Sequence, residues 1–327
     1  IKSARMKGIN RNILVLLGDG ELQEGQIWES LRSASNESMS EMYIIVDNNK
    51  IQSDNWVNLT SDNGDLRLKF ESFGCHVEEI DGHNLSEIYS TFENLKSVDD
   101  KPKIIIANTI KGYGVSFMHA DEKIREPDYE YPYHSGALSY EDYCKALLEL
   151  KKSLNSKLEN FGEREIVFEN YTKINESSNS INVSLLENYS KLLLENADNS
   201  KIVVMDGDLM KDHGLTEFKR KFPSKYIECG ISEQDMVSQA GTLALESYIP
   251  IVHSFASFLT TRANEQIYNN ATEKSKIVYV SGLCGLLPSG PGHSHQSVRD
   301  IGLMGNIPGM DVFHPASVND LKFIIKY

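Results

Sequence analysis

The sequence has little of what marks disulfide-bonded, zinc-binding or membrane-spanning proteins. Its four cysteines, Cys75, Cys144, Cys229 and Cys284, lie far apart and form no CxxC pair, so they suggest neither a zinc knuckle nor a disulfide framework. No apolar run approaches the roughly 20 residues that a membrane-spanning helix requires, and no signal peptide precedes the first predicted strand. We therefore expect a cytoplasmic protein with reduced thiols.

Positive charge is also scarce. The 327 residues include 33 Lys and Arg against 47 Asp and Glu, which gives a net charge of −14. This excess of negative charge disfavours nucleic-acid phosphates and anionic membranes as partners. The length allows two domains, each with its own core. An acidic soluble enzyme is therefore the expected class.

Apolar, β-branched runs alternate with a helix-like segment in the first part of the chain. Strand-like runs occupy 12–20, 42–49 and 102–109, and the segment 22–35 has helical spacing of its apolar residues. This βαβ rhythm predicts a mainly parallel sheet covered by helices. Functional groups are then expected at the carboxyl ends of the strands.

The composition becomes polar over 151–180, which we interpret as a linker between domains. A second α/β pattern follows, with a strand expected within 201–208 and a helix over 260–271. The predicted fold class is therefore α/β, with two tandem, mainly parallel-sheet domains at 1–150 and 181–327. We expect the first domain to lack its N-terminal part and the second its C-terminal edge.

Two turn sequences at strand ends carry oxygen ligands. Asp19 lies in a Gly-Asp-Gly turn after the first strand, and Asn49 ends the Asp-Asn-Asn turn after the second. Each is compatible with an ordinary turn. Neighbouring parallel strands would bring both to one edge of the sheet, where Gly18 and Gly20 let the backbone approach a ligand. A carboxylate, an amide oxygen and a nearby carbonyl suit Mg²⁺ bound to a diphosphate.

The ordered motifs resemble a known family. "GDGELQEGQIWES", "VDNNKIQSD" and "IIIANTIKGYGVSFM" resemble the thiamine-diphosphate-binding half of the transketolase family, and "ECGISEQDMVSQAGTLAL" and "HSFASFLTTRANEQI" resemble its pyrimidine-binding half. The resemblance implies that Asp19, Asn49 and the carbonyl of Ile51 bind Mg²⁺ together with thiamine diphosphate. The other expected cofactor-binding residues of this segment are Gly18, Gly20 and Glu21.

Two glutamates are implied as catalytic residues. By resemblance, Glu233 hydrogen-bonds N1′ of the cofactor's aminopyrimidine, and proton sharing there favours the imino tautomer that removes the proton from thiazolium C2. Taken alone, Glu233 would be interpreted as a solvated acid at a helix start. Glu24 matches a family acid that meets this glutamate across a subunit interface, which implies a homodimer with active sites at the interface.

Aromatic and histidine residues complete the implied site. Phe255 and Phe258 match the stretch that stacks on the cofactor ring, although core packing is an equally good interpretation of Phe255. His134 resembles a histidine that reaches the diphosphate and the reacting carbon, and His295 aligns with a substrate-site histidine. A single histidine is usually a structural residue, so both assignments depend on the motifs around them.

The sequence departs from the family at substrate-binding positions. Leu283 and Pro291 stand where transketolases carry a histidine and an aspartate that contact substrate hydroxyls. A Thr-Arg pair that helps to hold a sugar phosphate is absent, because the corresponding segment reads "SINVSLLEN". We therefore expect a modified or non-phosphorylated sugar as a substrate.

The resemblance implies an enzyme of carbohydrate metabolism. It would transfer a short ketol unit from a ketose-like donor to an aldehyde acceptor through a thiamine-diphosphate ylide and enamine. One alternative is an enzyme that resembles deoxyxylulose-phosphate synthase and uses a 2-oxoacid. Another is a non-catalytic or split subunit of a transketolase-like assembly.

Overall fold

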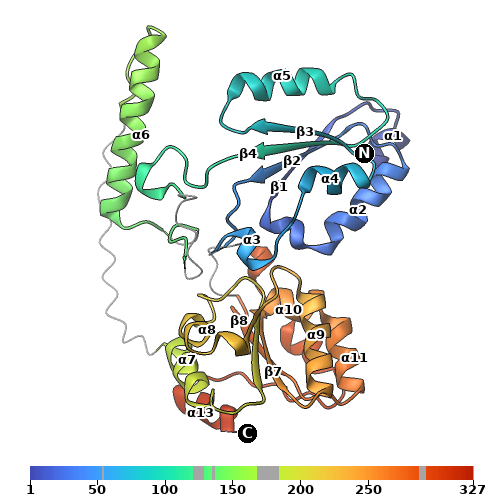
Figure 1. Cartoon of the computed structure of the whole chain (residues 1–327), viewed down its shortest axis with the longest axis vertical. Helices are drawn as coiled ribbons and strands as arrows, with labels where there is room; N and C mark the ends of the chain where they lie inside the picture. The colour runs from blue at the N-terminus through green and yellow to red at the C-terminus, as the bar shows by residue number, and fades with distance from the viewer. Residues whose placement is uncertain (54, 121–128, 135–136, 168–183, 287–291, 327) are drawn as a thin grey trace.

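The chain forms two α/β units, each built on one parallel sheet (Figure 1). The computed structural model describes residues 1–327 except 54, 121–128, 135–136, 168–183, 287–291 and 327. The predicted fold class, two tandem domains with mainly parallel sheets, is confirmed.

The first sheet has the strand order β1-β2-β4-β3, and all its pairs are parallel. Its strands are β1 (Ile13–Gly18), β2 (Met42–Asn48), β3 (His76–Asp81) and β4 (Lys103–Asn108). Isoleucine and valine dominate β2 and β4, and the central residues of β4 are fully buried. A sheet covered on both faces accounts for such continuous apolar runs.

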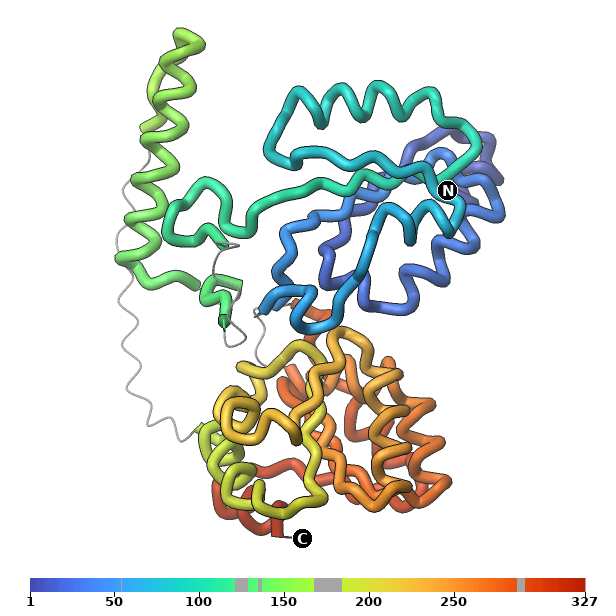
Figure 2. The backbone as a smooth tube through the Cα atoms, in the orientation of Figure 1, coloured from blue at the N-terminus to red at the C-terminus, as the bar shows by residue number. Residues whose placement is uncertain are grey.

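Helices cover both faces of this sheet. The helices of the first domain are α1 (Lys2–Met6), α2 (Gly25–Asn36), α3 (Val57–Thr60), α4 (Leu66–Ser72) and α5 (Leu85–Leu95). Leu31 of α2 and Phe70 of α4 pack on one face, and Leu95 of α5 packs on the other. The segment with α3 lies at the end of the first domain that faces the second domain (Figures 1 and 2).

The second sheet has the order β6-β5-β7-β8 and is also parallel. Its strands are β5 (Ile202–Asp206), β6 (Tyr226–Glu228), β7 (Ile249–Phe255) and β8 (Val278–Gly282). The helices are α7 (Leu185–Glu195), α8 (Thr216–Lys221), α9 (Glu233–Leu245), α10 (Ala256–Arg262), α11 (Asn264–Thr272), α12 (Asp300–Met304) and α13 (Val318–Lys326). Helices α9 to α12 pack on one face, and α7 and α8 on the other.

One expected helix differs from the structure. The helix predicted over 260–271 is two helices, because α10 already begins at Ala256 and ends at Arg262, and α11 begins at Asn264. Ala263 between them is fully buried and has a non-helical backbone (φ −98°, ψ 15°). The break places Arg262 at the end of a helix.

Helix α6 (Tyr140–Asn160) stands apart from both sheets (Figure 1). It continues into the segment 151–180 that the sequence suggests as a linker, and Ala146 is its one buried residue. The domain boundaries stay a prediction. No helix of the described segments is both long and apolar enough to cross a membrane.

Candidate active site

The end of β1 lies beside the end of β2. Gly18 is the parallel partner of Asp47, and the backbone N–H of Asp19 donates to the Asp47 carbonyl over 3.3 Å. This pairing brings Asp19 and Asn49 to one edge of the sheet, as the strand pattern predicts. The Asp19 side chain is only 2% exposed there.

Backbone groups hold the Asp19 carboxylate. Oδ1 accepts from the N–H of Gly20 over 2.8 Å, and Oδ2 accepts from the N–H of Lys50, whose backbone is left-handed (φ +68°). Burial raises the pKa of Asp19 to about 6, against the opposing effects of these N–H groups and of Lys111. A cation bound here would favour the ionised carboxylate.

Amide and carbonyl oxygens lie on the loop after β2. The Asn49 side chain donates to Asp47 Oδ2 over 3.2 Å and accepts from the Ile51 N–H over 3.0 Å, and the Ile51 carbonyl accepts from Lys111 Nζ over 3.2 Å. No group of three or more His, Cys, Asp or Glu side chains suited to a metal occurs among the described residues. The available donors are a carboxylate, an amide and a carbonyl, which fit Mg²⁺ that also binds phosphate oxygens.

The two glycines of the Gly-Asp-Gly turn have different surroundings. A Cβ on Gly20 would lie 2.7 Å from the Cβ of Gln52, so glycine is needed for close packing of two loops. A Cβ on Gly18 would meet no atom of the described residues within 4 Å. The carboxylate of Glu21 accepts from the Gly18 N–H over 3.2 Å.

Glu24 and Glu233 meet on one guanidinium group. Glu24 precedes α2, Glu233 is the first residue of α9, and Arg262 is the last of α10. Nη1 of Arg262 lies 2.5 Å from Glu24 Oε1 and 2.9 and 3.1 Å from the two Glu233 oxygens. Glu233 is 1% exposed, so the acid that the sequence suggests for catalysis is buried rather than solvated.

The Glu24 carboxyl is set up to hold a proton near neutral pH. Burial raises its pKa to about 7, and the neighbouring Glu233 carboxylate adds to the rise while Arg262 opposes it. Two carboxyl groups so close together can share one proton. This pair can therefore accept or release a proton near neutral pH.

The implied cofactor-stacking and substrate residues form one aromatic cluster. The ring centroids of Phe255 and Phe258 are 5.9 Å apart, and His295 lies 5.9 Å from the first and 4.9 Å from the second. The Arg262 guanidinium stacks over Phe258 at 4.3 Å. The three residues thus lie beside the Glu24–Arg262–Glu233 group, although Phe255 is largely buried.

His134 lies near residues 49–52 after β2, which carry the expected metal ligands Asn49 and Ile51 and are called the metal loop below. Its Nδ1 is 2.9 Å from Lys111 Nζ. Burial, followed by the charges of Lys111 and Lys211, lowers the pKa of His134 to about 4, so the imidazole is neutral at pH 7. A neutral ring can accept the hydrogen bond from the ammonium group.

The two domains contact each other through the loops that carry these residues. The side-chain oxygen of Gln23 accepts from the N–H of Ile231 over 2.8 Å, and Asp208 Oδ2 accepts from the N–H of Ser53 over 3.2 Å. These contacts and the meeting of the two glutamates lie within one chain. A site shared between two chains, as the resemblance implies, stays a prediction.

A cleft of about 370 Å³ opens at the carboxyl edge of the first sheet. Its lining includes Asp19, Asn48, Lys50, Asn63, Asp65 and Arg67. Asn63 also donates to the Asp19 carbonyl over 2.7 Å. Of the three expected metal ligands, Asp19 lines this cleft, whereas Asn49 and Ile51 do not.

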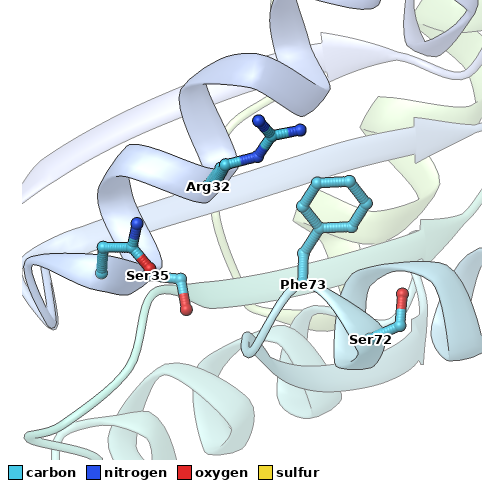
Figure 3. A pocket seen from close by; sticks show the side chains of 5 residues that line it. Arg32, Ser35, Ser72 and Phe73 are labelled. Carbon is cyan, nitrogen blue, oxygen red and sulfur yellow. The ribbon is translucent and has the colours of Figure 1, made fainter.

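A second hollow, of about 290 Å³, lies away from the predicted site residues (Figure 3). Arg32, Ser35 and Asn36 of α2 line it together with Ser72 and Phe73 at the end of α4. None of the predicted site residues is among them. We therefore assign the chemistry to the strand ends and not to this hollow.

Sequence reasoning missed two basic residues of the site. Arg262 and Lys111 both occur in motifs quoted for the family resemblance, but the carboxylates and carbonyls that they contact are 29 or more residues away along the chain. One signal was available in the sequence. Both residues are basic and lie in family motifs, and the acids and the carbonyl that they contact were already assigned to the site. Pro291, one of the two family departures, lies outside the described residues.

Comparisons with family models and with curated proteins identify the same family. Residues 4–127 match the model described as "Transketolase, thiamine diphosphate binding domain", and residues 189–327 match "Transketolase, pyrimidine binding domain". Transketolase-like protein 2 of Mus musculus is 27% identical over 316 residues, and human transketolase is 27% identical over 314 residues. Each alignment covers 93% of this chain and 48% of the relative, so the chain spans about half the length of these relatives.

Solved structures with similarity to the chain include a transketolase from Campylobacter jejuni. It is 21% identical with a TM-score of 0.42, over 97% of this chain and 54% of that one. A split gene transketolase, described as an inactive beta4 tetramer, is 34% identical with a TM-score of 0.38, over 43% of this chain and 46% of that one. Together, the two matching domain models and the curated relatives show that this chain belongs to the transketolase family, with its thiamine-diphosphate-binding domain followed by its pyrimidine-binding domain.

Proposed function

We propose that this chain acts, as a homodimer, in a transketolase-type reaction that moves a short ketol unit from a ketose-like donor to an aldehyde acceptor. The observation that carries the proposal is the meeting of Glu24 and Glu233 from separate domains on Arg262. Glu24 follows the strand end that bears Asp19, so acid–base groups and metal ligands come from connected loops.

The donor set at the strand ends supports binding of thiamine diphosphate with Mg²⁺. Asp19, Asn49 and the Ile51 carbonyl would hold the metal, which would supply positive charge for the diphosphate group. When bound, thiamine diphosphate supplies an acidic thiazolium carbon and stabilises the carbanion left after C–C bond cleavage.

The chain's own residues would bind and move protons around this group. Glu233 would hold a proton at the aminopyrimidine N1′, and Glu24 would keep a shared proton available close to neutral pH. Phe255 and Phe258 would pack on the cofactor ring and exclude water. His295 and His134 would orient the substrate hydroxyls and the diphosphate, respectively.

The substrate class follows from Leu283. Its aliphatic side chain stands where the family places a histidine, and it can neither donate nor accept a hydrogen bond. A buried sugar hydroxyl facing it would lose its water without gaining a partner, at a cost of about 1–3 kcal/mol. We propose a substrate that is deoxygenated or differently substituted near the reacting bond.

Calorimetry tests the cofactor assignment. We expect thiamine diphosphate to bind in the presence of Mg²⁺, and to bind much more weakly with EDTA or in the Asp19→Ala variant. Lys96→Met is a matched surface control, because Lys96 is an exposed partner of Glu93 on the same domain. Binding that is indifferent to EDTA and to Asp19→Ala would contradict the assignment.

A donor screen tests the reaction. With Mg²⁺, thiamine diphosphate and a generic aldehyde acceptor, a ketose donor should support product formation. A requirement for a 2-oxoacid donor would instead identify a synthase-like enzyme. Cofactor binding without turnover of any donor by the full-length protein would identify a non-catalytic subunit.

A further inference from the structure

A lysine ammonium group lies on the loop that is expected to bind the metal. Lys111 Nζ donates to the Ile51 carbonyl over 3.2 Å and to the Gln52 carbonyl over 2.5 Å. Lys111 follows β4, the strand that pairs with β2, and its positive charge acts on the Asp19 carboxylate. An ammonium group between backbone carbonyls and close to a carboxylate occupies the surroundings of a bound cation.

Further contacts hold Lys111 in this position. Its Nζ lies 2.9 Å from His134 Nδ1 and 5.0 Å from the centroid of the Tyr131 ring. Tyr131 is itself 3% exposed, and its hydroxyl donates to the Met118 carbonyl over 2.9 Å. The lysine is therefore oriented toward the loop by packed neighbours and does not extend freely into solvent.

The buried oxygen atoms of the metal loop need hydrogen-bond donors or a cation. Ile51 is 1% exposed and Gln52 is 5% exposed, and Asp19 lies within the same strand-end region. Removal of carbonyl groups and a carboxylate from water costs free energy unless a hydrogen-bond donor or a cation satisfies them. Lys111 meets this need with two of its three N–H groups directed at the carbonyls of residues 51 and 52.

We propose that Lys111 is a built-in counter-cation of the metal loop, which competes with the divalent metal for the Ile51 carbonyl and leaves it when the metal binds. The proposal rests on the proposed metal site at Asp19, Asn49 and Ile51. Two cations cannot share one carbonyl at close range without repulsion. The flexible four-carbon stem of lysine allows the ammonium group to move away while the backbone stays in place.

Replacement of the Lys111 ammonium group by the metal at the Ile51 carbonyl also affects His134. Because His134 Nδ1 accepts from the same ammonium group, movement of Lys111 also breaks this contact. Metal binding then releases the histidine that the family resemblance places at the cofactor diphosphate. Lys111 is thus a positioning residue, since it acts on the site through the loop and through His134.

Binding of Mn²⁺ in the absence of thiamine diphosphate tests the competition. The concentration of free Mn²⁺ is followed by electron paramagnetic resonance during titration of the full chain. Lys111→Met should bind Mn²⁺ about tenfold more tightly than the wild type, because a competing unit charge has been removed. Lys111→Arg, which retains the charge, should stay within about threefold of the wild type.

Two further variants separate this inference from the proposed function. Lys96→Met removes one exposed positive charge from the same domain and should leave Mn²⁺ affinity unchanged. Asp19→Ala should abolish binding. Loss of binding in Asp19→Ala with unchanged or weaker affinity in Lys111→Met would overturn the competition while leaving the metal site intact. Unchanged binding in Asp19→Ala would overturn both.

A second measurement does not depend on affinity. The ¹⁵Nδ1 resonance of His134 should shift when Mg²⁺ is added to the wild type, because the ammonium donor is withdrawn. In Lys111→Met the resonance should already be shifted, and Mg²⁺ should change it little. A wild-type resonance that does not respond to saturating Mg²⁺ would overturn the release of His134.

Discussion

Nη1 of Arg262 lies 2.9 Å from the buried carboxylate of Glu233, and the same nitrogen lies 2.5 Å from the carboxylate of Glu24. One positive charge therefore serves two acids from different domains. The arrangement joins the end of α10, the start of α9 and the start of α2 at a single point.

Removal of Arg262 should destabilise the protein. Arg262→Met leaves two carboxyl groups without their counter-charge, and the partly exposed position of Arg262 limits the cost to about 1–3 kcal/mol. Thermal unfolding should show a lower midpoint for this variant. The double variant Glu24→Gln/Arg262→Met should recover part of the loss, because one of the stranded charges is gone. No difference between the single and double variants would contradict the shared ion pair.

Glu24 should make stability depend on pH. Its pKa rises from 4.5 in the unfolded chain to about 7 in the folded chain, so the folded state binds the extra proton between these values. The contribution of Glu24 to stability should therefore fall as pH increases from about 4.5 to 7, by at most about 3 kcal/mol. Chemical denaturation at several pH values should show this fall in the difference between the unfolding free energies of the wild type and of Glu24→Gln. Identical pH profiles would contradict the raised pKa.

Mixing of two inactive variants tests whether one chain or two chains supply the residues of each site. The proposed homodimer, with each site shared by two chains, predicts that Asp19→Ala chains mixed with Glu233→Ala chains recover about a quarter of the wild-type activity in random hybrid dimers. A mixture that stays inactive after unfolding and refolding would contradict this sharing and would place the contact within one chain, where Glu24 and Glu233 meet in this structure.

Leu283 should limit turnover of standard sugar phosphates. Its backbone is left-handed (φ +51°), which histidine tolerates better than leucine does. Leu283→His should increase the specificity constant for xylulose 5-phosphate with ribose 5-phosphate by roughly ten- to hundredfold. Leu283→Met is the matched control and should bring no gain. A strong wild-type preference for this phosphorylated pair over deoxy analogues would contradict the specialised substrate.

The strand pattern was enough to predict the edge where the site lies. Alternation of apolar runs and turns gave two parallel sheets, and parallel pairing then placed Asp19 beside Asn49. The break at Ala263 was not predictable, since the apolar spacing of 260–271 continues through it. The partners of Arg262 and Lys111 could not be found either, because contacts such as 24 with 262 depend on how two domains pack and leave no periodic signal.

Hydrogen–deuterium exchange at C2 of bound thiamine diphosphate tests the central claim most directly. Nuclear magnetic resonance of the quenched cofactor should show much faster exchange on the wild-type protein with Mg²⁺ than in free solution. Glu233→Gln keeps a hydrogen-bonding side chain but cannot exchange the proton, so it should slow this exchange by about 100-fold or more. Exchange on the wild-type protein no faster than in free solution, or equally fast in Glu233→Gln, would contradict the catalytic role assigned to Glu233.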